Sequence, residues 1–243
     1  MPSQESFAVG RERAEVAFQR SKIYRILSSS FLYPDEELLR FLKEDPLSGE
    51  VATIAGLYPP GIDPSDLMQE FGGVSFDLDS MVDEYVRFFS LKNGCPPYEN
   101  EYYETNRYVY STEPMADIAG FYRAFGMGIQ GERPDHIGAE LEFMHLAARK
   151  EAEAAWKGLR EETELCASIQ RKFLQDHLGR WMDAFSEALE EAGSVLYHAI
   201  ARFLARWVDL ECRYLNASPE KMTSPLFRPI EGSGEEPPAC PGR

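Results

Sequence analysis

The sequence lacks the cysteine patterns that mark metal-binding or disulfide-rich proteins. Its four cysteines form no C-x-x-C pair, and we interpret them as isolated thiols of a reducing compartment: Cys95, Cys166, Cys212 and Cys240. It also lacks an N-terminal apolar run of secretory length, so no signal peptide is expected. The most apolar stretch, residues 194–210, is interrupted by His198, Arg202 and Arg206. That spacing predicts an amphipathic helix rather than a membrane span. We therefore expect a cytoplasmic protein.

Basic charge is scarce. Lys and Arg number 25 against 41 Asp and Glu, which gives a formal net charge of -16. A surface this acidic repels phosphate backbones and anionic lipid, so we expect neither a nucleic-acid partner nor a membrane partner. It would attract a basic peptide, although acidity also serves solubility alone.

Strand-like alternation is absent, and the apolar residues recur with a helical period. Two stripes are especially regular: Leu174, Leu178, Trp181, Phe185 and Leu189, then Tyr197, Ile200, Leu204 and Val208. We predict an all-α, single-domain bundle over residues 1–217, with about seven main helices and short satellites. Residues 46–76 are expected to form loops with short helices, and Asp79 or Ser80 to cap the helix after them. The Pro-, Gly- and Glu-rich residues 218–243 are predicted to be a flexible tail.

Acidic residues and histidines, the side chains that could bind a metal or transfer a proton, are concentrated in "ERPDHIGAELEFMH", residues 132–145. Glu142 and His145 have the E-x-x-H spacing that a helix uses to aim two ligands at one metal. On a helix, however, His136 and His145 point about half a turn apart, and no second E-x-x-H exists to complete a di-metal site. A helical-bundle metal- or cofactor-dependent enzyme is therefore the weaker alternative, and a general helical adaptor is a third.

The same stretch has the features of a helix start. Pro134 presets a turn, and Asp135 is suited to cap the free amides of the first helical turn. Glu140 follows His136 by one turn and is expected to share its proton. We predict that these groups form an exposed polar ledge, the lip of a docking cleft between helices.

Five tyrosines lie in or shortly after "GCPPYENEYY", and two interpretations of them are open. They either lie over the core with their hydroxyls in water or form a peptide-contact surface: Tyr98, Tyr102, Tyr103, Tyr108 and Tyr110.

Four segments resemble one family in the expected order. "ERPDHIGAELEFM" resembles the E-x-P-D-H motif of the TorD/DmsD/NarJ family of redox-enzyme maturation chaperones. "YRILSSSFLYP", "DEYVRFFSLKNGCPPYENEYY" and "MADIAGFYRAFGM" are similar to three further segments of that family. The residues of the last two segments are most similar to those of the branch that serves exported class II dimethylsulfoxide-reductase-type enzymes.

The resemblance implies an all-helical cytoplasmic chaperone without catalytic or metal residues. Such a protein binds the apo catalytic subunit of a molybdopterin oxidoreductase and its twin-arginine signal peptide, assists cofactor insertion and delays export. The positions carried over as client or signal-peptide contacts are Tyr98, Glu99, Phe121, Tyr122, Glu132, Pro134, Asp135, His136 and Glu140. No resident cofactor is expected. Some relatives bind guanine nucleotide and some exchange helices, so a monomer and a helix-swapped dimer are both compatible with the sequence.

Overall fold

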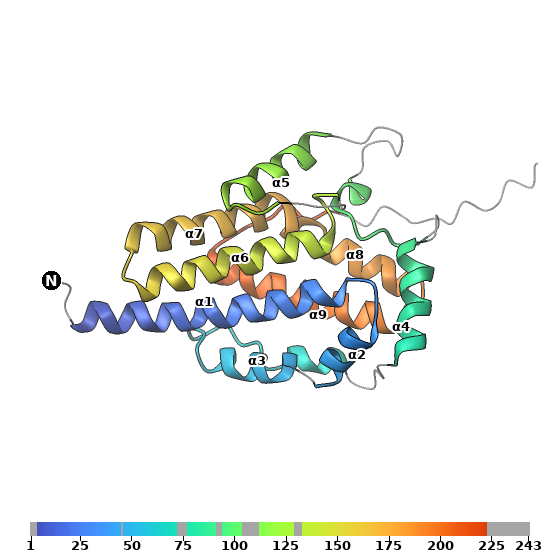
Figure 1. Ribbon diagram of the computed structural model, residues 1–243, viewed down its shortest axis with the longest axis horizontal. Coiled ribbons are helices and arrows are strands. Elements are labelled where there is room, and N and C mark those ends of the chain that lie inside the picture. Colours follow the sequence, from blue (N-terminus) through green and yellow to red (C-terminus); the bar gives the residue numbers. More distant parts are fainter. Residues whose placement is uncertain are drawn as a thin grey trace, which may run out of the picture.

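The computed structural model describes residues 4–44, 46–71, 77–90, 94–103, 112–128 and 133–222. Its α-helices are labelled in Figure 1: α1 Gln4–Ser30, α2 Glu36–Lys43, α3 Pro46–Ala55, α4 Leu78–Tyr85, α5 Thr112–Ala124, α6 Ile137–Trp156, α7 Arg160–Phe173, α8 Gly179–Glu191 and α9 Leu196–Leu215. Four short 3-10 or π turns accompany them: η1 Leu67–Phe71, η2 Val86–Ser90, η3 Glu99–Tyr102 and η4 Leu174–Leu178. The described residues contain no strand, which confirms the all-α prediction.

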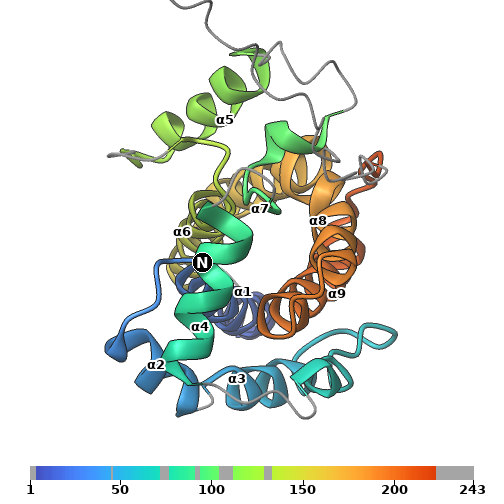
Figure 2. The same ribbon diagram turned by 90° about the vertical axis from the view of Figure 1, so that its right-hand side faces the viewer.

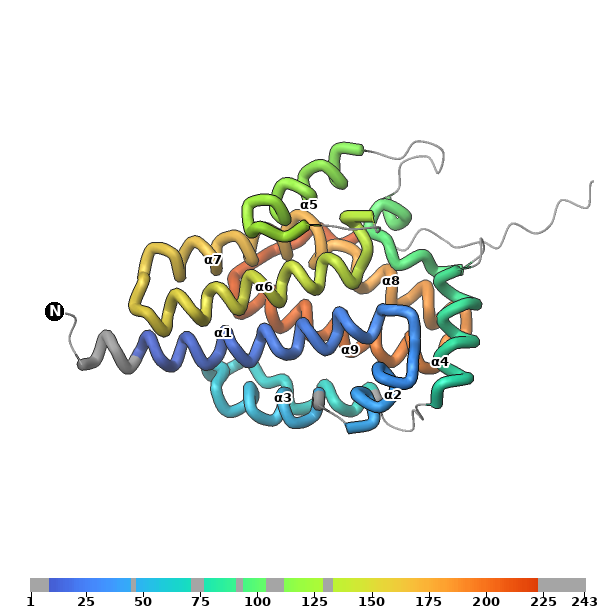
Figure 3. Tube along the Cα trace, in the orientation of Figure 1, coloured from blue at the N-terminus to red at the C-terminus, as the bar shows by residue number. Residues whose placement is uncertain are grey.

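Five helices enclose the core. Helix α6 packs between α1 and α7, and α8 packs on α9. Seen end-on in Figure 2, these helices surround the centre, with α2 and α3 on one side, α5 on the other and α4 crossing one end. The trace in Figure 3 shows α1 running along almost the whole bundle. The largest fully buried side chains, among them Trp181 and Trp207, fill the space between the helices.

The predicted stripes bury as expected. All five residues of the first stripe have no exposed surface, and those of the second are at most 2% exposed. The first stripe is not one continuous helix, however, because it begins in the π turn η4 and continues in α8. Helix α7 was not predicted as a separate helix, because it buries little beyond Thr163, Gln170 and Phe173. The predicted cap of α4 is also wrong, because Asp77 caps this helix by accepting from the amide of Ser80.

Two polar networks tie the helices together. The guanidinium of Arg20 on α1 is fully buried and donates to Glu211 on α9 at 2.7 Å and to Glu151 on α6 at 3.1 Å. At the other end of α9, the carboxylate of Glu84 on α4 accepts from the amide of Leu196 at 3.1 Å. It thereby caps α9 from another helix, where a negative charge is favourable.

The last described residues turn back onto the bundle. Helix α9 ends at Asn216, whose φ of 57° is the left-handed conformation that often closes a helix. The amide of Met222 then donates to the carbonyl of Arg180 at 2.8 Å, and Lys221 pairs with Asp183 and Asp209. The rest of the predicted tail, residues 223–243, lies outside the described residues.

Among the described helices, not one combines the length and the apolar character that crossing a bilayer requires.

Candidate functional site

The turn that precedes α6 is held by a segment some 35 residues earlier in the chain. His136 forms an antiparallel bridge with Tyr98. The amide of Glu99 donates to the carbonyl of Asp135, and the amide of Ile137 donates to the carbonyl of Pro97, both at 2.9 Å. Two segments that the sequence analysis assigned to the site are therefore adjacent in space.

Asp135 holds this turn from inside. Its carboxylate has no exposed surface and accepts from the amide of Asn100 at 3.2 Å and from Arg133 at 2.7 and 3.0 Å. The prediction that Asp135 caps α6 is wrong, because its oxygens are directed to Asn100 and Arg133 instead. A buried carboxylate with these donors fixes local geometry.

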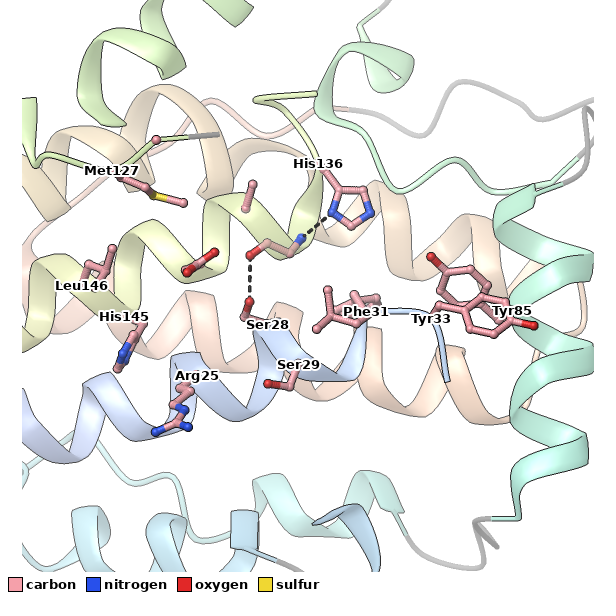
Figure 4. Close-up of a pocket in the computed structure, with 15 residues that line it drawn as sticks. Arg25, Ser28, Ser29, Phe31, Tyr33, Tyr85, Met127, His136, His145 and Leu146 are labelled. Carbon is pink, nitrogen blue, oxygen red and sulfur yellow. Dashed lines mark hydrogen bonds between the residues drawn. The ribbon is translucent and has the colours of Figure 1, made fainter. Parts of the chain in front are cut away.

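His136 is the N-cap of α6. Its Nδ1 accepts from the amide of Gly138 at 3.1 Å, so the neutral ring carries its proton on Nε2. The carbonyl of Gly138 in turn accepts from the hydroxyl of Ser28 at 2.8 Å, which fastens the start of α6 to α1 (Figure 4). The imidazole also meets the ring of Tyr98 edge-on, with centroids 5.2 Å apart.

Glu140 points into the core. Its carboxyl has no exposed surface, and its Oε2 accepts from the indole of Trp181 at 3.3 Å. Burial and the neighbouring carboxylate of Glu99 raise the pKa of Glu140 well above its ordinary value. The prediction of a proton shared with His136 is wrong, because the imidazole nitrogen facing the helix start is used by Gly138. The predicted exposed ledge is likewise wrong for Asp135 and Glu140.

Glu99 is the centre of a second buried polar group. It has no exposed surface, accepts from the hydroxyl of Tyr103 at 2.7 Å and contacts Nδ1 of His177 at 3.2 Å. Nε2 of His177 lies 3.1 Å from Asp117 on α5. His177 and Asp117 were not predicted to belong to the site. Asp117 lies in the family-like segment "MADIAGFYRAFGM", but His177 is 60 residues away and outside the family-like segments, so nothing in the sequence indicates that the two meet.

The predicted site residues on α5 attach that helix to the bundle. Tyr122 is buried, and its hydroxyl donates to the carbonyl of Pro134 at 2.8 Å. Phe121 is half-buried against Phe143 and Phe173, with ring centroids 5.9 and 5.3 Å apart. Tyr122 therefore positions the turn before α6, and Phe121 packs α5 onto α6 and α7.

The remaining predicted residues differ in accessibility. Tyr98 and Pro134 are half-buried, and the guanidinium of Arg133 lies 4.3 Å from the centre of the Tyr98 ring. Glu132 lies outside the described residues, as do Tyr108 and Tyr110. Tyr102 is buried against Trp181, so the idea that every tyrosine hydroxyl of this region is in water is wrong for it.

An accessible groove opens beside this buried framework. It has a volume of about 600 Å³ and lies between the second half of α1 and the first half of α6 (Figure 4). His136 lines it, and so do Phe31, Leu32, Tyr33, Tyr85 and Met127. Leu32 and Tyr33 are 54% and 59% exposed, so the groove presents apolar surface to solvent at one end. Such surface on a monomer commonly marks a binding site.

The other end of the groove is polar. Arg25 and Glu142 reach it with exposed side chains. His145 lies there too, and its Nδ1 is 2.8 Å from the carbonyl of Ser21. Burial lowers the pKa of His145 below its ordinary value, so its imidazole is neutral at pH 7.

The two histidines of residues 132–145 do not meet. Figure 4 shows His136 at the start of α6 and His145 farther along that helix, about two and a half turns away. Across the part of the chain that the structure describes, no group of three His, Cys, Asp or Glu side chains could hold a metal ion. The groove therefore offers a bound segment an apolar surface, the neutral imidazole of His145 and the charged side chains of Arg25 and Glu142.

Comparison with known proteins identifies the relatives of this chain. The family described as the nitrate reductase delta subunit matches residues 70–187, which include both halves of the site framework. The perchlorate reductase assembly chaperone protein of Dechloromonas aromatica (strain RCB) is 27% identical over 218 residues, 87% of this chain and 93% of that protein. Both matches bear out the resemblance to the TorD/DmsD/NarJ family that the motifs indicate.

A solved structure is similar at lower identity. A protein from Archaeoglobus fulgidus, assigned to the redox enzyme maturation proteins, is 22% identical with a TM-score of 0.44. The similarity covers 78% of this chain and 93% of that one.

The apolar groove residues Phe31, Leu32 and Tyr33 were not predicted to belong to the site, although they lie in the family-like segment "YRILSSSFLYP". A usable signal existed, because Leu32 and Tyr33 are large apolar residues just before Pro34, where the helical stripe has ended.

Proposed function

We propose that this protein is a cytoplasmic assembly chaperone for the catalytic subunit of a molybdenum-cofactor-dependent oxidoreductase. It acts by binding rather than by catalysis. It holds the apo subunit and its twin-arginine signal peptide, assists cofactor insertion and delays export until assembly is complete. The observation that carries this proposal is the relative named as a perchlorate reductase assembly chaperone, which matches nearly end to end.

The groove between α1 and α6 is the proposed binding site for the signal peptide. A twin-arginine signal joins basic residues to an apolar stretch. The exposed Leu32 and Tyr33, with Tyr85 beside them, offer burial to the apolar part, and the carboxylate of Glu142 offers a partner to a cation. This is helix-in-groove or extended-peptide recognition, in which apolar burial supplies most of the affinity.

The acidity of the chain supports the same partner. A net charge of -16 favours encounter with a basic peptide and disfavours anionic competitors. Each exposed ion pair contributes only about 0–1 kcal/mol, so charge influences the rate and the choice of partner more than the final affinity.

The family motif has a supporting role in this proposal. Asp135 and Glu140 are buried, and His136 caps α6 while one edge of its ring reaches the groove. In the described conformation, Asp135 and Glu140 do not line the groove, and among the described motif residues His136 is the side chain placed to touch a ligand. Contact of the other predicted residues with a client remains a prediction.

The proposal is tested by titrating the protein with a synthetic twin-arginine signal peptide from a reductase subunit of the same cell. In the variant Leu32→Asp with Tyr33→Asp, two exposed apolar side chains become charged, so folding should be little affected. Burying one such side chain is worth about 1.5–3 kcal/mol, so we expect the peptide to bind at least about tenfold more weakly.

Leu165→Asp is the matched control, because Leu165 is an equally exposed leucine, 58%, on α7 outside the groove. Its peptide affinity should equal that of the wild type. Failure of the wild type to bind either the peptide or the apo subunit on gel filtration would contradict the chaperone proposal. Equal weakening by both variants would contradict the choice of groove.

A further inference from the structure

His177 joins three parts of the molecule at one buried point. It lies in η4 between α7 and α8, and only 3% of its surface is exposed. Nδ1 contacts Glu99 of η3 at 3.2 Å, and Nε2 contacts Asp117 of α5 at 3.1 Å. The imidazole is therefore a buried polar link between the bundle and α5, in addition to the contacts of Phe121 and Tyr122.

Both contacts are hydrogen bonds only when the imidazole carries two protons. A carboxylate accepts hydrogen bonds and donates none, whereas a neutral imidazole has one N–H and one bare nitrogen. A neutral His177 would point a lone pair at one of the two carboxylates. Protonated, it forms two charge-assisted hydrogen bonds.

The charged groups around His177 favour the protonated form. Burial alone would lower the pKa of His177, but the hydrogen bonds and charges of Glu99 and Asp117 outweigh it and raise that pKa above its ordinary value. Further groups face this cluster from neighbouring elements: Tyr103 at the end of η3, Glu140 on α6, Lys172 on α7, Asp176 in η4 and Arg180 on α8. Lys172 and Asp176 pair with each other, which leaves Asp117 as the anion nearest to Nε2.

The proton on Nε2 of His177 can be exchanged with solvent. Asp117 is 57% exposed, whereas Glu99 is sealed inside the bundle. The Nε2 proton can therefore be lost to solvent on the α5 side while the contact to Glu99 stays in place.

We propose that His177 is a proton-operated latch: it clamps α5 onto the bundle when protonated and releases it when the Nε2 proton is lost. Release of α5 withdraws Phe121 from Phe143 and Phe173, and Tyr122 from the carbonyl of Pro134. The latch thus controls both an aromatic surface under α5 and the turn before α6. This inference does not depend on what the groove binds.

Hydrogen–deuterium exchange followed by mass spectrometry tests the latch on the full-length protein alone. In the wild type, we expect the protection factor of the α5 amides to fall by up to about tenfold per pH unit above pH 6.5, as one linked proton requires. Amides of α9 serve as the internal reference, since neither carboxylate that contacts His177 lies on that helix. Unchanged α5 protection from pH 6.5 to 8.5 would overturn the proposal.

Two variants separate the latch from ordinary stability effects. In His177→Gln, α5 should be poorly protected at every pH relative to α9, because the neutral amide cannot donate to two carboxylates in this geometry. Asp117→Asn changes only the exposed partner of His177, so it should fold normally. It therefore tests the same proposal if His177→Gln folds poorly. It should likewise remove the pH dependence in α5.

His198→Gln is the matched control. His198 lies on α9, is 17% exposed and approaches a carboxylate, that of Glu190, only at 3.9 Å. Its α5 protection and pH dependence should equal those of the wild type. A pH dependence that survives in His177→Gln would refute the latch.

Discussion

Replacing Glu140 by glutamine tests whether the core of this protein holds a proton. The Glu140 carboxyl is fully buried, and its Oε2 accepts from Trp181 at 3.3 Å. Its Oε1 finds no hydrogen-bond partner among the described residues, and Glu99 lies beside it. A glutamine amide has the same shape, accepts from Trp181 and donates to Glu99 without ionising. The variant should therefore fold normally.

The magnitude of the effect is set by proton linkage. The pKa of Glu140 is raised by burial and by Glu99, so the folded protein keeps a proton that the unfolded chain releases above about pH 4.5. The free energy of unfolding therefore falls as pH rises, by up to about 1.4 kcal/mol per pH unit until the folded-state pKa is passed. From pH 5 to pH 8 the largest possible loss from this carboxyl is about 4 kcal/mol.

Urea unfolding at several pH values measures this loss. Near pH 5, the wild type and Glu140→Gln should have similar stability, and the variant should become progressively more stable than the wild type towards pH 8. His177 contributes a loss in the same direction above pH 6.5, but it is present in both proteins and cancels in the difference.

Glu142→Gln is the control, because Glu142 lies on the same helix with an exposed side chain. Its pH profile should follow the wild type. Parallel profiles for the wild type and Glu140→Gln would refute the buried proton, and equal urea m-values are required for the comparison to hold.

Two further predictions concern other buried groups. Arg20→Met removes the cation that joins Glu151 and Glu211 and leaves both carboxylates buried without it, so urea unfolding should show a loss of about 3–5 kcal/mol. Burial raises the pKa of Cys95 to about 11 and that of Cys212 to about 12, so at pH 8 iodoacetamide should label both only after unfolding. Labelling of either one in the folded protein, detected by peptide mass spectrometry, would contradict their burial.

The helices could be predicted from the sequence wherever apolar residues repeat along one segment. The stripe from Leu174 to Leu189 and the one from Tyr197 to Val208 identified two inward faces correctly, because helical period is a local property. Helix α7 was missed because two of its three buried residues, Thr163 and Gln170, are polar, so a search for an apolar stripe does not find its inward face.

The site was only partly predictable for a different reason. The motif around Pro134 and His136 was recognised in the sequence. In the structure it lies next to Tyr98 and Glu99, which belong to another of the family-like segments. The burial of Asp135 and Glu140 was not foreseen, since a helical projection gives the direction of a side chain but not what covers it. Trp181 and Glu99, which cover Glu140, come from distant segments.

By itself, the sequence determined the all-helical class, the acidic character and the family resemblance, because composition, helical period and short motifs are local properties of the chain. Only the tertiary structure decided which polar residues are inside the bundle, which line an accessible groove, and that His177 meets Glu99 and Asp117. The reason is that burial and charge pairing depend on which distant segments pack together, and helical period carries no information about that choice.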